Sequence, residues 1–118
     1  MVRREEVEAF LKDFIYKLNF WGLLIRTDRT NPKNTITLLA LEFKHVHVRQ
    51  ILAGLKPEDY SEGPLTDKLY GVSDMWVFGK TIKQKEIYIK IQIGPPSSAT
   101  ICISFHFSKF AMSYPLKK

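Results

Sequence analysis

The chain has 118 residues, of which 45% are hydrophobic and 13% aromatic, so disorder is excluded and one domain spanning residues 1–118 is expected. A single cysteine, Cys102, excludes an internal disulfide, and the sequence has no Cys/His cluster that suggests structural zinc. The net charge of +6 favours nucleic acid or an acidic protein as the partner.

Neither a transmembrane segment nor a signal peptide is apparent in the sequence. No run approaches the roughly 18 consecutive apolar residues that a membrane-spanning helix requires. The charged residues at positions 3–6 are not followed by the hydrophobic stretch of a signal peptide. We therefore expect a cytoplasmic protein that does not associate with a membrane.

The first half of the chain predicts two helices and two strands. Apolar residues recur at spacings of three and four between residues 4 and 18, which is typical of a helix with one buried stripe. Residues 20–27 and residues 35–43, the latter rich in Thr, Ile and Leu, predict two strands around a polar turn at 28–34. Residues 45–55 predict a second helix. The apolar residues on one face of that helix are Val48, Ile51, Leu52 and Leu55.

The second half of the chain predicts an antiparallel sheet. Residues 56–68 read as a polar loop that can open with a short helical turn, and residues 111–118 read as a loose tail. Between them, three strands joined by short turns predict an antiparallel meander. The whole chain therefore predicts an α+β fold, with a mainly antiparallel sheet of about five strands and two helices packed on one face. The three strands of the meander are predicted at residues 70–80, 86–94 and 100–108.

The last two predicted strands alternate strictly between apolar and polar residues. Successive side chains of a strand point to opposite faces of the sheet, so this pattern predicts one apolar and one polar face. Tyr88, Lys90 and His106 belong to the polar face. On a basic protein, this combination could carry out acid–base chemistry on a phosphodiester. The other members of the polar face are Glu86, Gln92, Cys102 and Ser104.

Five short pieces of sequence occur in an informative order and spacing. They are Leu41-Glu42-Phe43; Ile51-Leu52-Ala53-Gly54-Leu55 followed by Glu58-Asp59-Tyr60; Trp76 in a strand; Ile87-Tyr88-Ile89-Lys90-Ile91; and Ile103-Ser104-Phe105-His106. In this order they resemble the MqsR toxins, which are RelE-like mRNA interferases of bacterial type II toxin–antitoxin systems. The likeness covers most of the chain, from about residue 9 to 107.

The resemblance implies metal-independent cleavage of mRNA without a cofactor, expected at the ribosome, and neutralisation by a cognate antitoxin protein. It assigns the catalytic tyrosine to Tyr88 and the basic residue of the last strand to His106, where the family has a lysine. Two further positions depart from the family. Val77 stands where a glutamine is expected, and Ser61 stands where a loop lysine is expected, for which Lys68 is a candidate substitute.

RNA cleavage without a metal needs three contributions from side chains. One group accepts the proton of the 2′-hydroxyl, one stabilises the phosphorane, and one protonates the leaving 5′-oxygen. A histidine has an ordinary pKa of about 6.5, whereas tyrosine is the better acid unless a cation such as Lys90 depresses its pKa. We assign the proton transfers to Tyr88 and His106 and the phosphate to Lys80 and Lys90. The residues predicted to bind RNA are Lys68, Lys80, Lys83 and Lys85.

Two other interpretations fit the sequence. The exposed face of any antiparallel sheet alternates in this way, so Tyr88, Lys90 and His106 also fit a solvated surface. In that case the chain is a plain interaction protein, basic because its partner is acidic. The departures at Val77 and Ser61 favour a third possibility, a non-catalytic RNA- or protein-binding domain with the same fold.

Overall fold

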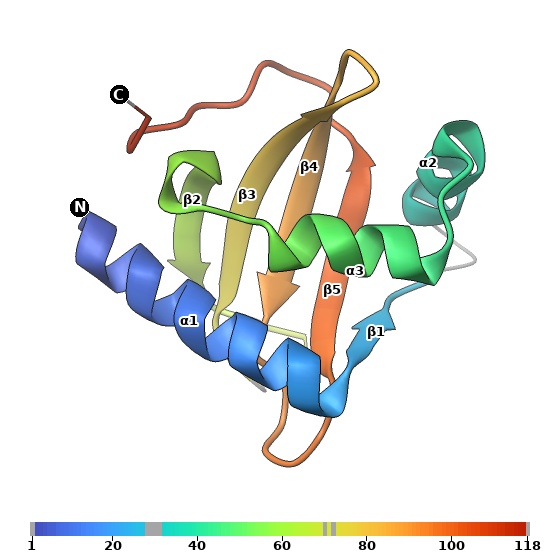
Figure 1. The fold of residues 1–118 in the computed structure, drawn as a ribbon. Coiled ribbons are helices and arrows are strands. Elements are labelled where there is room, and N and C mark those ends of the chain that lie inside the picture. The colour runs from blue at the N-terminus through green and yellow to red at the C-terminus, as the bar shows by residue number, and fades with distance from the viewer. Residues whose placement is uncertain (1, 28–31, 70, 72, 118) are drawn as a thin grey trace.

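The structure, a computed structural model, describes residues 2–27, 32–69, 71 and 73–117 (Figure 1). It is an α+β fold, as the sequence predicts. The predicted turn residues 28–31, residues 70 and 72 of the first meander strand, and residue 118 of the tail lie outside the described residues. The elements are α1 (Arg4–Trp21), β1 (Leu23–Ile25), α2 (Lys33–Leu41), α3 (His45–Ala53), the 3₁₀ turn η1 (Pro57–Asp59), β2 (Tyr60–Leu65), β3 (Met75–Ile82), β4 (Lys85–Gln92) and β5 (Thr100–Phe107).

The five strands form one sheet in the order β1-β5-β4-β3-β2. The predicted meander is confirmed, because β3 pairs antiparallel with β4 and β4 pairs antiparallel with β5. The sheet is mixed rather than purely antiparallel, since β1 runs parallel to β5. A parallel neighbour needs a crossover connection, and here the connection from β1 to β5 contains every other helix and strand except α1.

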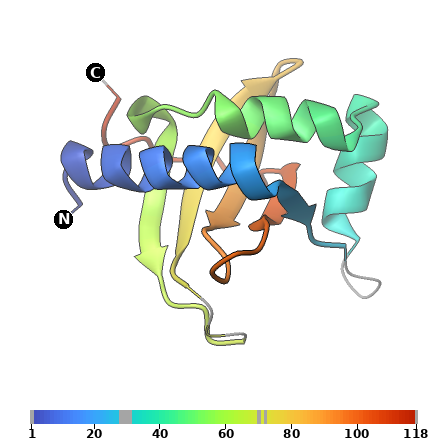
Figure 2. The ribbon, with the colours of Figure 1, turned by 60° about the horizontal axis from the view of Figure 1, so that its bottom comes forward.

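Helices α1 and α3 cover one face of the sheet, and Figures 1 and 2 show both lying across the strands on that side. Each helix turns an apolar stripe inward, at the spacings that the sequence predicts. The other face of the sheet is not covered by these helices, so it is free to carry polar side chains. The fully buried residues of the core include Val7, Phe14, Leu18, Val48, Leu52, Phe78, Ile87, Ile89, Ile91 and Phe105.

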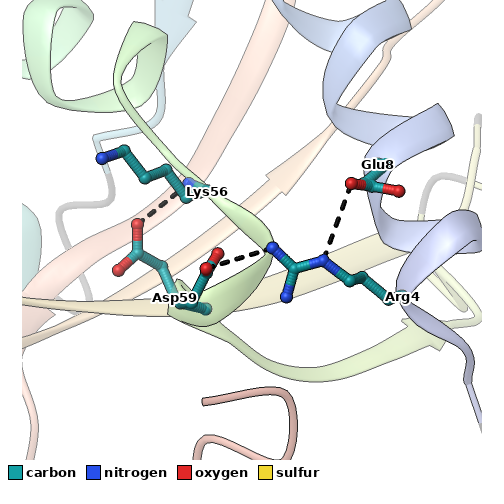
Figure 3. A network of polar contacts seen from close by, with 5 residues as sticks. Arg4, Glu8, Lys56 and Asp59 are labelled. Carbon is teal, nitrogen blue, oxygen red and sulfur yellow. Dashed lines mark hydrogen bonds and ion pairs between the residues drawn. The ribbon is translucent and has the colours of Figure 1, made fainter. Parts of the chain in front are cut away.

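Polar contacts fix both ends of α1. At its start, the guanidinium of Arg4 forms ion pairs with Glu8 one turn along the helix and with Glu58 of η1, at 3.6 and 3.0 Å (Figure 3). In its fourth turn, the ammonium of Lys17 donates to the backbone carbonyls of Ile93 and Pro95. The helix is therefore tied to the β2 side of the sheet and to the turn that follows β4.

Most of the predicted strand at residues 35–43 is a helix in the structure, so the described part of the chain has three α-helices rather than two. This helix, α2, packs beside β5 beyond the end of the short β1 strand. Asn34 connects α2 to the residue after β1 and to β5. Its side-chain amide donates to the carbonyls of Arg26 and Ile103, and its Oδ1 accepts from the Phe105 amide. One turn later, the Thr37 hydroxyl accepts from the amide of Phe107. Two side chains of α2 thus make the hydrogen bonds to the edge of β5 that a neighbouring strand would otherwise make.

Two further corrections concern the strands. Residues 20–27 contain a strand of only three residues, β1, because α1 continues as far as Trp21. Residues 60–65, predicted as part of a loop, form the edge strand β2, and the short helical turn predicted before them is present as η1. Edge strands are often short and irregular, so the sequence signal for β1 and β2 is weak.

A β-bulge in β5 overturns the predicted strict alternation of that strand. The register shifts between the pairs Lys90–Ser104 and Ile91–Cys102, so Ile103 is the extra residue. On the N-terminal side of the bulge, each side chain of β5 therefore points to the face opposite to the one predicted. Cys102 is therefore fully buried in the core cluster rather than on the polar face, and Ile101 lies opposite Gln92. Burial raises the pKa of the Cys102 thiol to about 12.

The C-terminal segment, expected to be a loose tail, crosses the uncovered face of the sheet in the structure. The amide of Met112 and the hydroxyl of Tyr114 both donate to the carboxylate of Glu86, at 3.0 and 2.6 Å. Tyr114 lies over β3 at Gly79, where the Cβ of any other residue would collide with the phenol. The segment therefore forms part of the surface of this face.

Candidate functional site

Tyr88 and His106 lie side by side on the face of the sheet that α1 and α3 leave uncovered. They are direct cross-strand partners in the antiparallel pair of β4 and β5, and such partners share a face. Their ring centroids are 5.2 Å apart and the ring planes differ by 12°, so the rings are stacked. The alternation in the sequence predicted this shared face, and the bulge in β5 lies far enough along the strand to leave it intact.

The two rings line a cavity of about 420 Å³. Its floor is the sheet, and further walls come from β2, from the first residue of α2 and from the C-terminal segment. This volume lies in the range of roughly 300 to 1,000 Å³ that is usual for small-ligand sites. The lining residues are Lys33, Ser61, Glu62, Val77, Tyr88, His106, Ser108, Lys109, Phe110, Ala111, Met112 and Ser113.

A bulge in β2 brings two successive residues into the cavity wall. The register shifts between the pairs Tyr60–Phe78 and Glu62–Val77, so Ser61 and Glu62 both line the cavity while Tyr60 is buried in the core. Bulges commonly redirect side chains in this way next to functional sites. The Glu62 carboxylate is therefore placed on the same face as Tyr88.

Val77 contributes an apolar patch to the floor of the cavity. It is the cross-strand partner of both Glu62 and Lys90, and only 1% of it is exposed. The family resemblance places a glutamine at this position. A valine can neither donate nor accept a hydrogen bond, so the floor next to Tyr88 offers no polar contact from β3.

The environment of His106 favours a neutral imidazole with one defined basic nitrogen. Nδ1 lies 3.1 Å from the carbonyl oxygen of Phe107, and a carbonyl only accepts, so we assign the proton to Nδ1 and the lone pair to Nε2. Desolvation is the largest cause and lowers the pKa of His106; the bond to the Phe107 carbonyl raises it, and the positive charges of Lys33, Lys90 and Lys109 each lower it by less. At neutral pH this imidazole is able to accept a proton.

Tyr88 is held in its protonated form. Desolvation raises the pKa of its phenol, and the negative charge of Glu62 raises it further. The ammonium of Lys90 lies 5.8 Å from the centre of the Tyr88 ring. The expectation that Lys90 would depress the pKa of Tyr88 is therefore not met, because burial and Glu62 act in the opposite direction. The phenol serves as a proton or hydrogen-bond donor.

Two of the lysines predicted to bind RNA point away from the cavity. Lys80 stands opposite Ile87 on the helix-covered face, and its ammonium forms an ion pair with Asp59 at 3.2 Å. Lys83, in the turn between β3 and β4, donates to the carbonyl of Leu41 at 2.8 Å. Neither side chain lines the cavity around Tyr88 and His106.

The remaining predicted RNA-binding lysines lie at the two ends of the sheet. Lys85 is an exposed residue at the start of β4, opposite Ile82. Lys68 is exposed in the connection after β2, next to Asp67, whose carboxylate accepts from Gln92 at the far end of β4. Lys68 is therefore not in the position of the missing loop lysine, and Ser61 itself lines the cavity.

The position of three charged cavity residues was not predicted from the sequence, although Lys33 was considered as a possible guide for phosphates. Glu62 fell in a segment taken for a loop, because Tyr60-Ser61-Glu62 before a Gly-Pro pair shows no alternation that would predict a strand. Lys33 was assigned to a turn and Lys109 to the chain after the last strand. Only the packing of α2 and of the C-terminal segment brings these two lysines to the site, so local sequence patterns do not place them next to His106.

Within the part of the chain that the structure describes, no three His, Cys, Asp or Glu side chains come together as a metal site. Likewise, no helix among the described residues has the length and apolar character needed to cross a membrane. The sequence matches no protein-family model. It also matches no curated protein and no solved structure, so the likeness to the MqsR toxins remains an expectation from the sequence.

Proposed function

We propose that this chain is a metal-independent endoribonuclease that cleaves mRNA, with Tyr88 and His106 as its proton-transfer groups. The observation that carries the proposal is the stacked pair of rings in one cavity, 5.2 Å apart, with pKa values displaced in opposite directions. A neutral imidazole next to a protonated phenol provides a base and an acid at the same pH. Lysines around the pair provide positive charge for a phosphodiester.

In this mechanism Nε2 of His106 takes the proton of a ribose 2′-hydroxyl. The 2′-oxygen then attacks the adjacent phosphorus, the bond between phosphorus and the 5′-oxygen breaks, and Tyr88 gives its proton to the departing 5′-oxygen. The products are a 2′,3′-cyclic phosphate and a free 5′-hydroxyl. Lys90 stabilises the negative charge that develops on the phosphorane. Solvent afterwards returns a proton to Tyr88 and removes one from His106.

The biological role that we propose is that of a toxin of the MqsR and RelE-like kind, neutralised by a cognate antitoxin protein. Support comes from the order of five sequence pieces and from an α+β fold in which the matched tyrosine and histidine share a cavity. Within this proposal the fold is RelE-like and the substrate is mRNA at the ribosome. Growth arrest after induced expression in a bacterial host is the expected cellular result.

The direct test compares the wild-type protein with the double variant Tyr88→Phe/His106→Ala on RNA in the presence of a chelator. We expect cleavage by the wild type, cyclic phosphate ends on the products, and no cleavage by the double variant. Tyr16→Phe is a matched control, because Tyr16 is 75% exposed on α1 and far from the cavity lining. Equal cleavage by the wild type and the double variant would refute the assignment of the two residues.

One observation favours a second candidate, a non-catalytic RNA- or protein-binding domain with the same fold. The apolar Val77 stands in the cavity floor where the resemblance expects a glutamine. If that glutamine contacts the phosphate in the relatives, its loss weakens stabilisation of the transition state more than binding of the substrate. RNA binding without cleavage by the wild-type protein would favour this candidate.

A further inference from the structure

Two cavities meet at His106. The larger one, of about 420 Å³, lies over the sheet and contains Tyr88. The smaller one, of about 170 Å³, lies between α2, the end of β5 and the C-terminal segment. Both are lined by Lys33, His106 and Lys109, so the surface continues from one cavity to the other past the imidazole.

The lysines shared by the two cavities carry charge that no acidic group in the described part of the chain neutralises by an ion pair. Lys33 comes from the first turn of α2, and Lys109 follows β5. Both are exposed, yet both lie close enough to His106 to act on it electrostatically, as does Lys90 from β4. Like charges brought together from three separate elements repel one another, and a bound anion relieves this repulsion.

The charged and titratable groups that face His106 are few. They are Lys90 and Tyr88 from β4, Glu62 from β2, Lys33 from α2 and Lys109 from the C-terminal segment. Of the residues that the structure describes, Glu62 is the one acidic residue that lines the larger cavity, and it belongs to the opposite wall. Among the described residues, none that lines the smaller cavity is acidic, so the charges that these residues supply there are positive.

We propose that Lys33 and Lys109 form a subsite for the backbone phosphate next to the scissile one. Single-stranded RNA would then run from the larger cavity, past His106, into the smaller one. At about 170 Å³ the smaller cavity is below the roughly 300 Å³ that ligand pockets usually reach, so it suits a phosphate and part of a ribose rather than a whole nucleotide. The apolar walls formed by Ile36 and Phe107 suit the face of the sugar.

This inference rests on the proposed function for its substrate, but its test does not depend on cleavage. The probe is a short, fluorescently labelled 2′-O-methyl oligouridylate, which has no free 2′-hydroxyl and stays intact. Its affinity for the protein is measured by anisotropy over a series of NaCl concentrations. For single-stranded RNA, the magnitude of the slope of log K against log salt grows by about 0.7 for each phosphate that lysines contact.

The double variant Lys33→Gln/Lys109→Gln is expected to lower the magnitude of that slope by about 0.7, since the contact to one phosphate is lost. The matched control is Lys12→Gln/Lys44→Gln, which removes the same net charge from exposed positions on α1 and before α3. The control is expected to keep the wild-type slope to within about 0.3, less than half of one contact. Circular dichroism checks that all the proteins are folded.

An equal slope for the wild type and the Lys33/Lys109 variant overturns the subsite, and so does an equal reduction in both double variants. A reduction confined to the Lys33/Lys109 variant supports it, whether or not the wild-type protein cleaves RNA. If binding follows this pattern while natural RNA stays intact, the subsite stands and the proposed nuclease function falls.

Discussion

Replacing Asn34 with alanine tests the role of α2 as a substitute for a strand. The side chain of Asn34 makes three hydrogen bonds, to the carbonyls of Arg26 and Ile103 and to the amide of Phe105. A hydrogen bond in a folded protein contributes about 1 kcal/mol net, so the three together contribute about 3 kcal/mol. Alanine is the better helix former by about 0.6 kcal/mol, which offsets part of this loss.

We therefore expect Asn34→Ala to lower the free energy of unfolding by roughly 2 to 3 kcal/mol. Urea denaturation followed by tryptophan fluorescence measures this change, and an unchanged m value would show that the denatured state is not affected. Thr37→Val gives the scale for one bond, because it removes only the acceptor for the Phe107 amide and should cost about 1 kcal/mol. Thr35→Ala is the control on the exposed side of α2 and should stay within about 0.5 kcal/mol of wild type.

The ranking of the three variants by their loss of unfolding free energy decides whether Asn34 holds the edge of β5. If Asn34→Ala costs no more than Thr37→Val, the side chain of Asn34 does not hold the edge of β5 as the distances of 2.9 and 3.0 Å indicate. Water would then have to satisfy the Phe105 amide in the variant. In that case the packing of α2 depends on its apolar residues, such as Leu41, and not on its polar face.

Three further outcomes are expected. Lys109→Gln removes one of the charges that lower the pKa of His106, so the pKa should rise and the acid limb of the pH dependence of kcat/KM for RNA cleavage should move to higher pH; an unmoved limb contradicts this. Cys102, buried and with its pKa raised to about 12, should react with a thiol reagent only after unfolding in urea, and rapid labelling of the native protein contradicts its burial. Glu86→Gln should weaken the anchoring of Tyr114, so that limited proteolysis cuts the C-terminal segment several times faster, as mass spectrometry can show, whereas unchanged cutting means that packing alone holds the segment.

The sequence predicted those helices and strands in which the hydrophobic pattern repeats regularly, over at least two helical turns or two pairs of strand residues. The first helix, the helix from residue 45 and the three meander strands were found because burial on one face imposes their pattern directly on the sequence. Residues 35–43 were misread as a strand because Thr and Ile favour strands locally. The buried residues of this helix are Asn34, Thr37 and Leu41, which recur at helical spacing, but two of the three are polar because they adjoin a strand edge.

For the candidate site too, some residue positions follow from local sequence patterns and others only from tertiary packing. The shared face of Tyr88 and His106 follows from strand alternation, so the sequence alone contained it. The partners that set their pKa values, Glu62, Lys33 and Lys109, come from a bulged edge strand, from α2 and from the C-terminal segment. Each of these placements depends on tertiary packing, which a residue pattern within one element does not encode.

Helix α2 links the stability of the fold to the electrostatics of the site. His106 lies between Phe105 and Phe107, whose amides are held by Asn34 and Thr37 of that helix. The same helix begins with Lys33, one of the charges that lower the pKa of His106. Loosening α2 therefore moves a positive charge away from the imidazole and should raise its pKa. Asn34→Ala should shift the titration of His106 upward even where the protein is fully folded, and a titration identical to that of wild type would show that α2 does not position the charge.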